Sequence, residues 1–172
     1  MHDAPSIDAV LAGLAEEFDF LGDWESRIEY LIDLGKDLEP LPDADRVDAN
    51  KVPGCAAQVW LATRRRDERM VFLADSDSAL SKGNIALLLR LYSNRTPAEI
   101  LAFDARAALD RLGLPSALTR QRANGLNAMV GRIREEAAAA AAQAGQGAGN
   151  GVSFTEMRTR PSPSSVQTPT DR

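Results

Sequence analysis

The segment Gln58–Leu73, QVWLATRRRDERMVFL, is the strongest indication of fold class in this chain. Both of its ends are rich in β-branched, aromatic and aliphatic residues, a composition typical of β-strands. The short charged run Arg65–Arg69 between them indicates the turn of an antiparallel hairpin. We also expect a brief third strand near Arg46–Val52. Because a two-stranded hairpin is marginal in water, the sheet must pack against helices.

Helical patterns lie before this hairpin in the sequence. Ile7–Glu17 and Trp24–Leu34 carry apolar residues at helical spacing, with Ser6 and Asp23 as their N-caps. Gly35 fits the left-handed position at which many helices end. We therefore expect two amphipathic helices ahead of the sheet.

More helices are expected after the hairpin. In chain order they are Ala79–Tyr92 behind the capping residues Asp75–Ser78, a short helix from the capping box at Thr96, Ala105–Leu112, and Thr119–Ala142. The run 85–91 is apolar all round, so its helix should lie in the centre of the core. Strands in the middle of the sequence with helices on both sides indicate an α+β fold, a small antiparallel sheet of two or three strands packed against several helices.

The composition changes near Ala144. Residues 145–172 are rich first in glycine and then in proline and serine, and they contain little apolar surface to bury. We therefore expect one folded domain over residues 1–144 and a disordered tail over 145–172.

Composition excludes several classes of protein. The chain has 172 residues and a formal net charge of −5, which argues against a general nucleic-acid-binding protein. Its N-terminus shows no secretory signal, and its longest apolar run, Ile85–Leu89, is far shorter than the roughly 20 residues that span a bilayer. A single cysteine excludes an intramolecular disulfide and a metal cage of cysteines from one chain. We expect a cytoplasmic protein that binds neither nucleic acid nor membrane.

Cys55 is the candidate reactive residue, within the sequence NKVPGCAAQVW. Pro53 fixes φ and Gly54 opens backbone conformations closed to other residues, so the thiol can sit at a loop tip. The one histidine, His2, is at the N-terminus, so a reactive Cys55 would act as a solitary thiol in exchange chemistry. A cation such as Lys51 nearby would raise its thiolate fraction. The alternative is a buried structural cysteine.

Four segments resemble motifs of the SufE family of sulfur-acceptor proteins, in the family's order and spread over residues 18–137. They are Asp23–Gly35, Asn50–Trp60, Asp75–Gly83 and Arg120–Met129. The resemblance implies an α+β fold similar to the IscU-type scaffold. It also implies that Cys55 takes persulfide sulfur from a cysteine desulfurase and passes it to an iron–sulfur scaffold complex.

The resemblance further implies an accessory protein that stimulates the desulfurase rather than a stand-alone enzyme. Pyridoxal phosphate belongs to the desulfurase, so this chain is expected to carry no cofactor, and its one cysteine is too few to ligate a cluster. Two alternatives remain open. One is an activator that binds the desulfurase without accepting sulfur, and the other is the paralogous CsdE-type acceptor of a different desulfurase. Whether the chain is a monomer or a homodimer is also open.

Two more residues match family positions. Asp77 is expected to set the cysteine loop or the docking surface, with a plain helix N-cap as its alternative. Arg122 is expected to contact the desulfurase or steady the sulfur anion, with a solvated surface charge as its alternative. The chain departs from the family at Ala56 and Ala57, where polar residues are usual, and at Asn84, where an apolar residue is usual.

Overall fold

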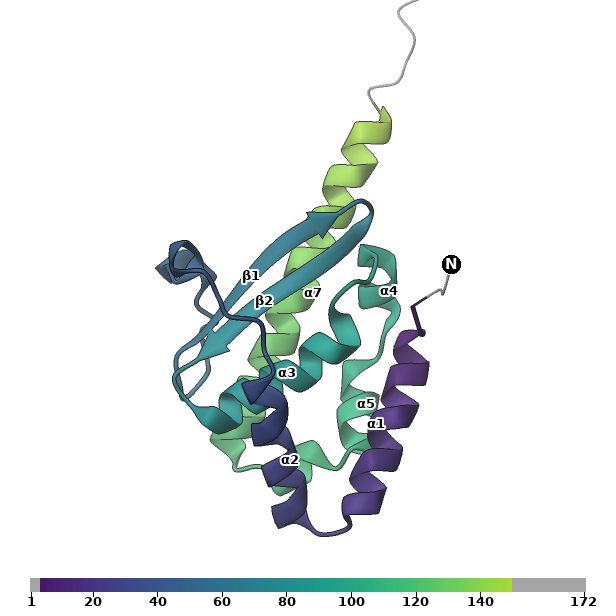
Figure 1. Ribbon diagram of the computed structural model, residues 1–172. Coiled ribbons are helices and arrows are strands. Elements are labelled where there is room, and N and C mark those ends of the chain that lie inside the picture. Colours follow the sequence, from purple (N-terminus) through teal and green to yellow (C-terminus); the bar gives the residue numbers. More distant parts are fainter. Residues whose placement is uncertain (1–3, 150–172) are drawn as a thin grey trace, which may run out of the picture.

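The computed structural model describes residues 4–149 (Figure 1). In this part of the chain a two-stranded antiparallel sheet packs against helices, so the expected α+β class is confirmed. The elements in chain order are α1 (Ile7–Leu21), α2 (Trp24–Lys36), the short 3-10 turns η1 (Asp43–Asp45) and η2 (Asp48–Asn50), β1 (Val59–Arg66), β2 (Arg69–Ser76), α3 (Ala79–Tyr92), α4 (Pro97–Ala102), α5 (Ala105–Arg111), α6 (Leu114–Ala117) and α7 (Arg120–Gly149).

The hairpin forms as expected, with β1 and β2 paired from Val59 opposite Ser76 to Arg66 opposite Arg69. The third strand near Arg46–Val52 does not form. That segment contains η2 and an isolated bridge between Lys51 and Trp60. Asp and Asn side chains compete with a strand's hydrogen bonds by bonding to nearby backbone, which explains the difference.

The central helix α3 is buried along most of its length. Its buried residues are Gly83, Asn84, Ile85, Ala86, Leu87, Leu88, Leu91 and Tyr92. α2 and β2 both pack on α3, and the long α7 passes behind the hairpin (Figure 1). The helix that the sequence shows as apolar all round is therefore the one enclosed on several sides.

The expected caps at Ser6, Asp23 and Thr96 are confirmed, because each side chain accepts a backbone N–H of the first helical turn. The expected end of α2 at Gly35 is wrong. The helix continues to Lys36, and Gly35 lies inside it, facing α3. A Cβ added at Gly35 would lie 2.8 Å from the backbone nitrogen of Gly83, so this glycine permits a close helix crossing.

The last helix is longer than expected and runs to Gly149 rather than Ala142. Of the tail expected over 145–172, the structure describes only 145–149, which continue α7, and the rest lies outside the described residues. Within residues 4–149, none of the helices combines the length and the hydropathy that crossing a bilayer requires.

Candidate active site around Cys55

Cys55 lies in a short loop that joins Val52 to β1. The backbone N–H of Val52 donates to the carbonyl of Val59 at 2.9 Å, which ties the two ends of the loop together. Val52 and Val59 are both buried, so these ends are fixed in the core. Gly54 has φ 90°, a left-handed conformation that glycine adopts at little cost. The Pro53–Gly54 turn thus presents the cysteine, as its sequence indicates.

The loop rests on α7. The Cys55 side chain is half-buried, and its Sγ lies 3.6 Å from the carbonyl oxygen of Gly125. A Cβ added at Gly125 would lie 3.5 Å from the Cα of Cys55, and one added at Gly54 would lie 3.4 Å from the Cβ of Ala128. Small residues on this face of α7 therefore let the loop backbone approach the helix closely.

Burial raises the pKa of the Cys55 thiol above its ordinary value. The resting thiol is therefore protonated at neutral pH and weakly nucleophilic. Lys51, the cation expected to favour the thiolate, has other partners. Its ammonium pairs with Asp48 at 3.1 Å and lies 5.9 Å from the ring centroid of Trp60.

Asp77 holds the far end of the cysteine loop. Its Oδ1 accepts the backbone N–H of Gln58 at 3.0 Å, and its own N–H donates to the Gln58 carbonyl at 3.3 Å. The hydroxyl of Ser76 donates to the same carbonyl at 2.7 Å. The N-cap of α3 is Ser78, whose side chain accepts the N–H of Ser81. The geometry thus places Asp77 as a tether of the loop rather than as the helix cap.

Arg122 lies in the first turn of α7 and is exposed. Its backbone N–H donates to the hydroxyl of Thr119 at 3.4 Å. Within the described part of the chain its guanidinium has no hydrogen bond or ion pair. Arg122 precedes Gly125 by three residues, a spacing that places both on one side of a helix. An exposed cation therefore lies on the helix on which the thiol rests.

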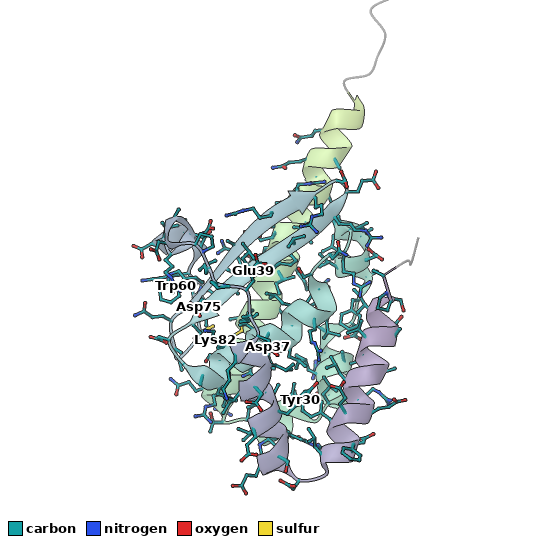
Figure 2. All side chains as sticks on the ribbon, viewed as in Figure 1. Tyr30, Asp37, Glu39, Trp60, Asp75 and Lys82 are labelled. Atoms are coloured by element: carbon teal, nitrogen blue, oxygen red, sulfur yellow. The ribbon has the colours of Figure 1, made fainter. Side chains whose placement is uncertain are left out.

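Sequence reasoning missed a buried charge cluster next to the loop. Asp75 is 9% exposed and pairs with Arg46 and with Lys82, the latter at 3.3 Å. Figure 2 shows Asp75 and Lys82 close to Trp60, whose ring centroid lies 5.5 Å from the Arg46 guanidinium. Burial alone would raise the pKa of Asp75, but hydrogen bonds from Ser76, Arg46 and Lys82 hold it below its ordinary value. The cluster joins β2, α3 and the segment before the loop.

No local signal reveals this cluster. Asp75 stands beside three other capping-type residues, and its partner Arg46 is distant in the sequence. Asp75 and Lys82 both lie in the family-like segment Asp75–Gly83, but nothing in that segment points to Arg46.

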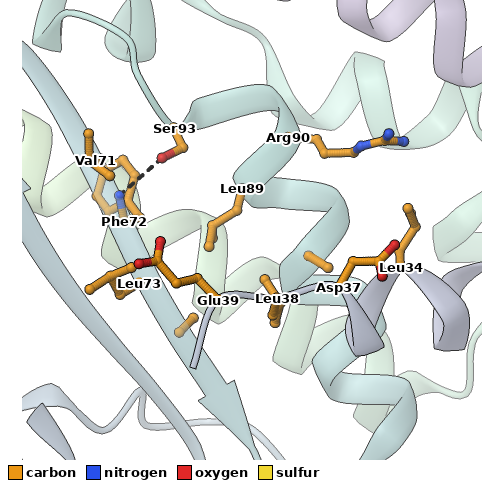
Figure 3. A pocket seen from close by; sticks show the side chains of 12 residues that line it. Leu34, Asp37, Leu38, Glu39, Val71, Phe72, Leu73, Leu89, Arg90 and Ser93 are labelled. Carbon is orange, nitrogen blue, oxygen red and sulfur yellow. Dashed lines mark hydrogen bonds between the residues drawn. The ribbon is translucent and has the colours of Figure 1, made fainter. Parts of the chain in front are cut away.

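A surface groove lies away from the thiol. It has a volume of about 310 Å³ and lies between the end of α2, β2 and the C-terminal half of α3 (Figure 3). Its floor and rim include Leu34, Leu38, Phe72 and Leu89, with Asp37 and Glu39 at the edge. Cys55 does not line it, so this groove is separate from the thiol. Among residues 4–149 no three His, Cys, Asp or Glu side chains are grouped to share a metal ion.

Three comparisons bear on this arrangement. The SufE family model, described as an Fe-S metabolism associated domain, matches residues 12–137. An uncharacterized SufE-like protein of Rhizobium etli is 44% identical over 133 residues, which make up 75% of this chain and 90% of that protein. An uncharacterized SufE-like protein of Rhizobium meliloti is 39% identical over 136 residues, 77% of this chain and 94% of that protein.

The fold is also found among solved structures. The solution structure of a hypothetical protein from Thermus thermophilus matches with a TM-score of 0.65 at 19% identity. The match covers 77% of this chain and 96% of that one, so the two share a fold.

Proposed function

The chain belongs to the SufE family, which is associated with iron–sulfur metabolism, and we propose that it is a sulfur acceptor working through Cys55. In this proposal Cys55 takes persulfide sulfur from a cysteine desulfurase and passes it to an iron–sulfur assembly scaffold. The observation that carries the proposal is the setting of the only thiol in the chain. It sits on a glycine-led loop that is tied at both ends and half-covered by α7.

The proposed step is a thiol exchange. The Cys55 thiolate attacks the outer sulfur of the desulfurase persulfide, a new S–S bond forms to Cys55, and the S–S bond to the desulfurase cysteine breaks. The desulfurase cysteine leaves as a thiolate and takes up the proton that Cys55 gave up. The outer sulfur moves with no net oxidation or reduction, so one thiol suffices and no acid–base residue is required beside it.

The partial burial of Cys55 supports a thiol that is unreactive at rest and becomes reactive only during transfer. A thiol with a raised pKa is protected from stray electrophiles and oxidants, because the thiolate is the reactive form. Transfer then requires the desulfurase to draw the thiol outward or to supply a more polar surrounding. The loop is suited to such a movement, since Pro53, Gly54 and Ala56 are already exposed.

The docking surface is proposed to include Arg122. Its exposed guanidinium can pair with a carboxylate of the desulfurase beside the transfer site, and such a contact would make the complex salt-sensitive. Arg122→Ala should then weaken the complex while leaving stability within about 0.5 kcal/mol, as is usual for an isolated surface charge. Pyridoxal phosphate and cluster ligands are expected on the partners, and the cytoplasm is the expected location.

The deciding experiment weighs the intact protein after incubation with a cysteine desulfurase and free cysteine. We expect a gain of sulfur that a reductant removes and that Cys55→Ser abolishes. Ala56→Ser is the matched control, since it places a hydroxyl one residue away and leaves the thiol in place. Desulfurase stimulation by both the wild type and Cys55→Ser, with no gain of sulfur on the wild type, would contradict transfer and favour an activator that only binds.

A further inference from the structure

The resting thiol contacts Gly125 of α7. Its carbonyl oxygen is 3.6 Å from Sγ, a distance at which an S–H group donates a weak hydrogen bond. The glycine is buried and separated from Cys55 by 70 positions in the sequence. The contact is therefore made by the fold and not by the loop itself.

The absence of a side chain at Gly125 matters as much as its carbonyl group. A Cβ at Gly125 would meet the Cα, Sγ and Cβ of Cys55 at 3.5, 3.7 and 3.8 Å, which is ordinary contact. One methyl group thus fills the available space, and a larger side chain would occupy the space in which the Cys55 side chain lies. At Gly131, farther along the same helix, an added Cβ meets nothing within 4 Å.

We propose that Gly125 is a positioning residue for sulfur transfer, whose carbonyl holds Cys55 in its seat only while Sγ carries a hydrogen. The inference rests on the proposed function of Cys55. When Sγ gains an outer sulfur it has no hydrogen left to donate, so the bond to Gly125 is lost. The added sulfur also needs room in a seat that already touches the helix. Loading therefore weakens the hold of α7 on the loop and favours release of the loaded thiol toward an acceptor.

Infrared spectroscopy tests the hydrogen bond between Cys55 and the Gly125 carbonyl directly, because a single cysteine gives a single S–H stretching band. In the full-length protein we expect a band at the lowered frequency of a hydrogen-bonded thiol. Gly125→Ala should keep it, since a Cβ there fits at contact distance. Gly125→Val should move the band toward the frequency of a free thiol, whereas Gly131→Val, the matched control on α7, should not.

Alkylation of Cys55 by iodoacetamide gives a second readout. Gly125→Val should raise the rate at neutral pH by up to about fivefold, the factor that corresponds to one typical hydrogen bond of about 1 kcal/mol, and lower the apparent thiol pKa. Gly131→Val should match the wild type in both. A band and an alkylation rate unchanged in Gly125→Val would overturn the positioning role.

This outcome is separate from the test of transfer. A wild type that loads sulfur from the desulfurase while Gly125→Val shows the wild-type band would overturn the positioning role alone. A wild type that never gains sulfur would overturn the proposed function instead, whatever the infrared band shows.

Discussion

In the structure the Cys55 thiol is in a state of low nucleophilicity. Burial raises its pKa, its sulfur faces a carbonyl, and the nearest expected cation, Lys51, pairs with Asp48. A carbonyl accepts from a thiol but repels a thiolate, so the seat selects the protonated form. At the scale of single residues the structure therefore favours the protonated thiol, and the proposed transfer requires a change in its surroundings.

The Asp77 tether can be tested on its own. Asp77→Ala leaves the N–H of Gln58 without its 3.0 Å acceptor, so the end of the cysteine loop should loosen. We expect a stability loss of about 1 kcal/mol or less, as for one exposed hydrogen bond, and faster alkylation of Cys55. Alkylation kinetics and amide hydrogen exchange at Gln58 measure the two effects.

Asp104→Ala is the matched control for this test, because Asp104 also accepts a backbone N–H, that of Ala107, but lies outside the loop. It should cost similar stability and leave alkylation unchanged. Equal alkylation rates in the two variants would show that Asp77 does not restrain the loop.

At the scale of elements, the crossing of α2 and α3 depends on two glycines. Gly35 and Gly83 face each other, and a Cβ at either would meet backbone atoms of the opposite helix. Backbone cannot swing aside as a side chain can, so the helices can cross this closely only with glycine at both positions. The crossing fixes α3, from which Lys82 reaches Asp75 beside the cysteine loop.

Gly83→Ala should therefore be strongly destabilising. The added Cβ would overlap the Leu31 carbonyl oxygen and lie 2.6 Å from the Leu31 carbonyl carbon. We expect a loss of about 3 kcal/mol in the free energy of unfolding, at the upper end for overpacking. Gly13→Ala in α1, where a Cβ meets nothing within 4 Å, should instead gain up to about 1 kcal/mol from helix propensity. Urea denaturation compares the two, and equal stabilities would contradict the close crossing.

At the scale of the whole molecule, Tyr92 lies where several helices meet. It is fully buried at the end of α3, its ring packs edge-on against Phe103 at 5.7 Å between centroids, and Arg134 of α7 donates to the carbonyl of Phe103 at 3.3 Å. Burial raises the pKa of Tyr92 to about 12, against the lowering effect of Arg134. Ionisation of this one phenol therefore opposes the folded state as a whole.

This pKa predicts a loss of stability in alkali. Because the folded pKa lies above the unfolded value of 10.0, the contribution of Tyr92 is complete below pH 10 and is lost as pH rises toward 12. Two pH units correspond to about 3 kcal/mol. Tyr92→Phe should lose that much less stability between pH 9 and 12, as urea denaturation across this range would measure. A Tyr92→Phe profile parallel to that of the wild type would refute this prediction.

The sequence predicts most of the elements because their signals are local. Side-chain caps at Ser6, Asp23 and Thr96 act within one helical turn, and the hairpin follows from residues adjacent in the chain. Two of the errors have different physical reasons. The sequence pattern predicts a helix end at Gly35. In the structure a side chain at this position would instead collide with the backbone of α3. The third strand fails because the Asp and Asn residues near it form turns.

The sequence by itself determined the α+β class, the order of the hairpin and the longer helices, and the single thiol on a Pro–Gly turn, since each depends on neighbours a few residues apart. The short helix α6 (Leu114–Ala117) was not predicted. The tertiary structure alone decided where the thiol rests, that Asp77 tethers Gln58 instead of capping α3, and that Asp75 gathers Arg46 and Lys82. Cys55 and Gly125 are 70 positions apart in the sequence, Gln58 and Asp77 are 19 apart, and Arg46 and Asp75 are 29 apart. Periodicity and capping carry no information over such separations, because only the packing of α7, β2 and α3 brings those atoms together.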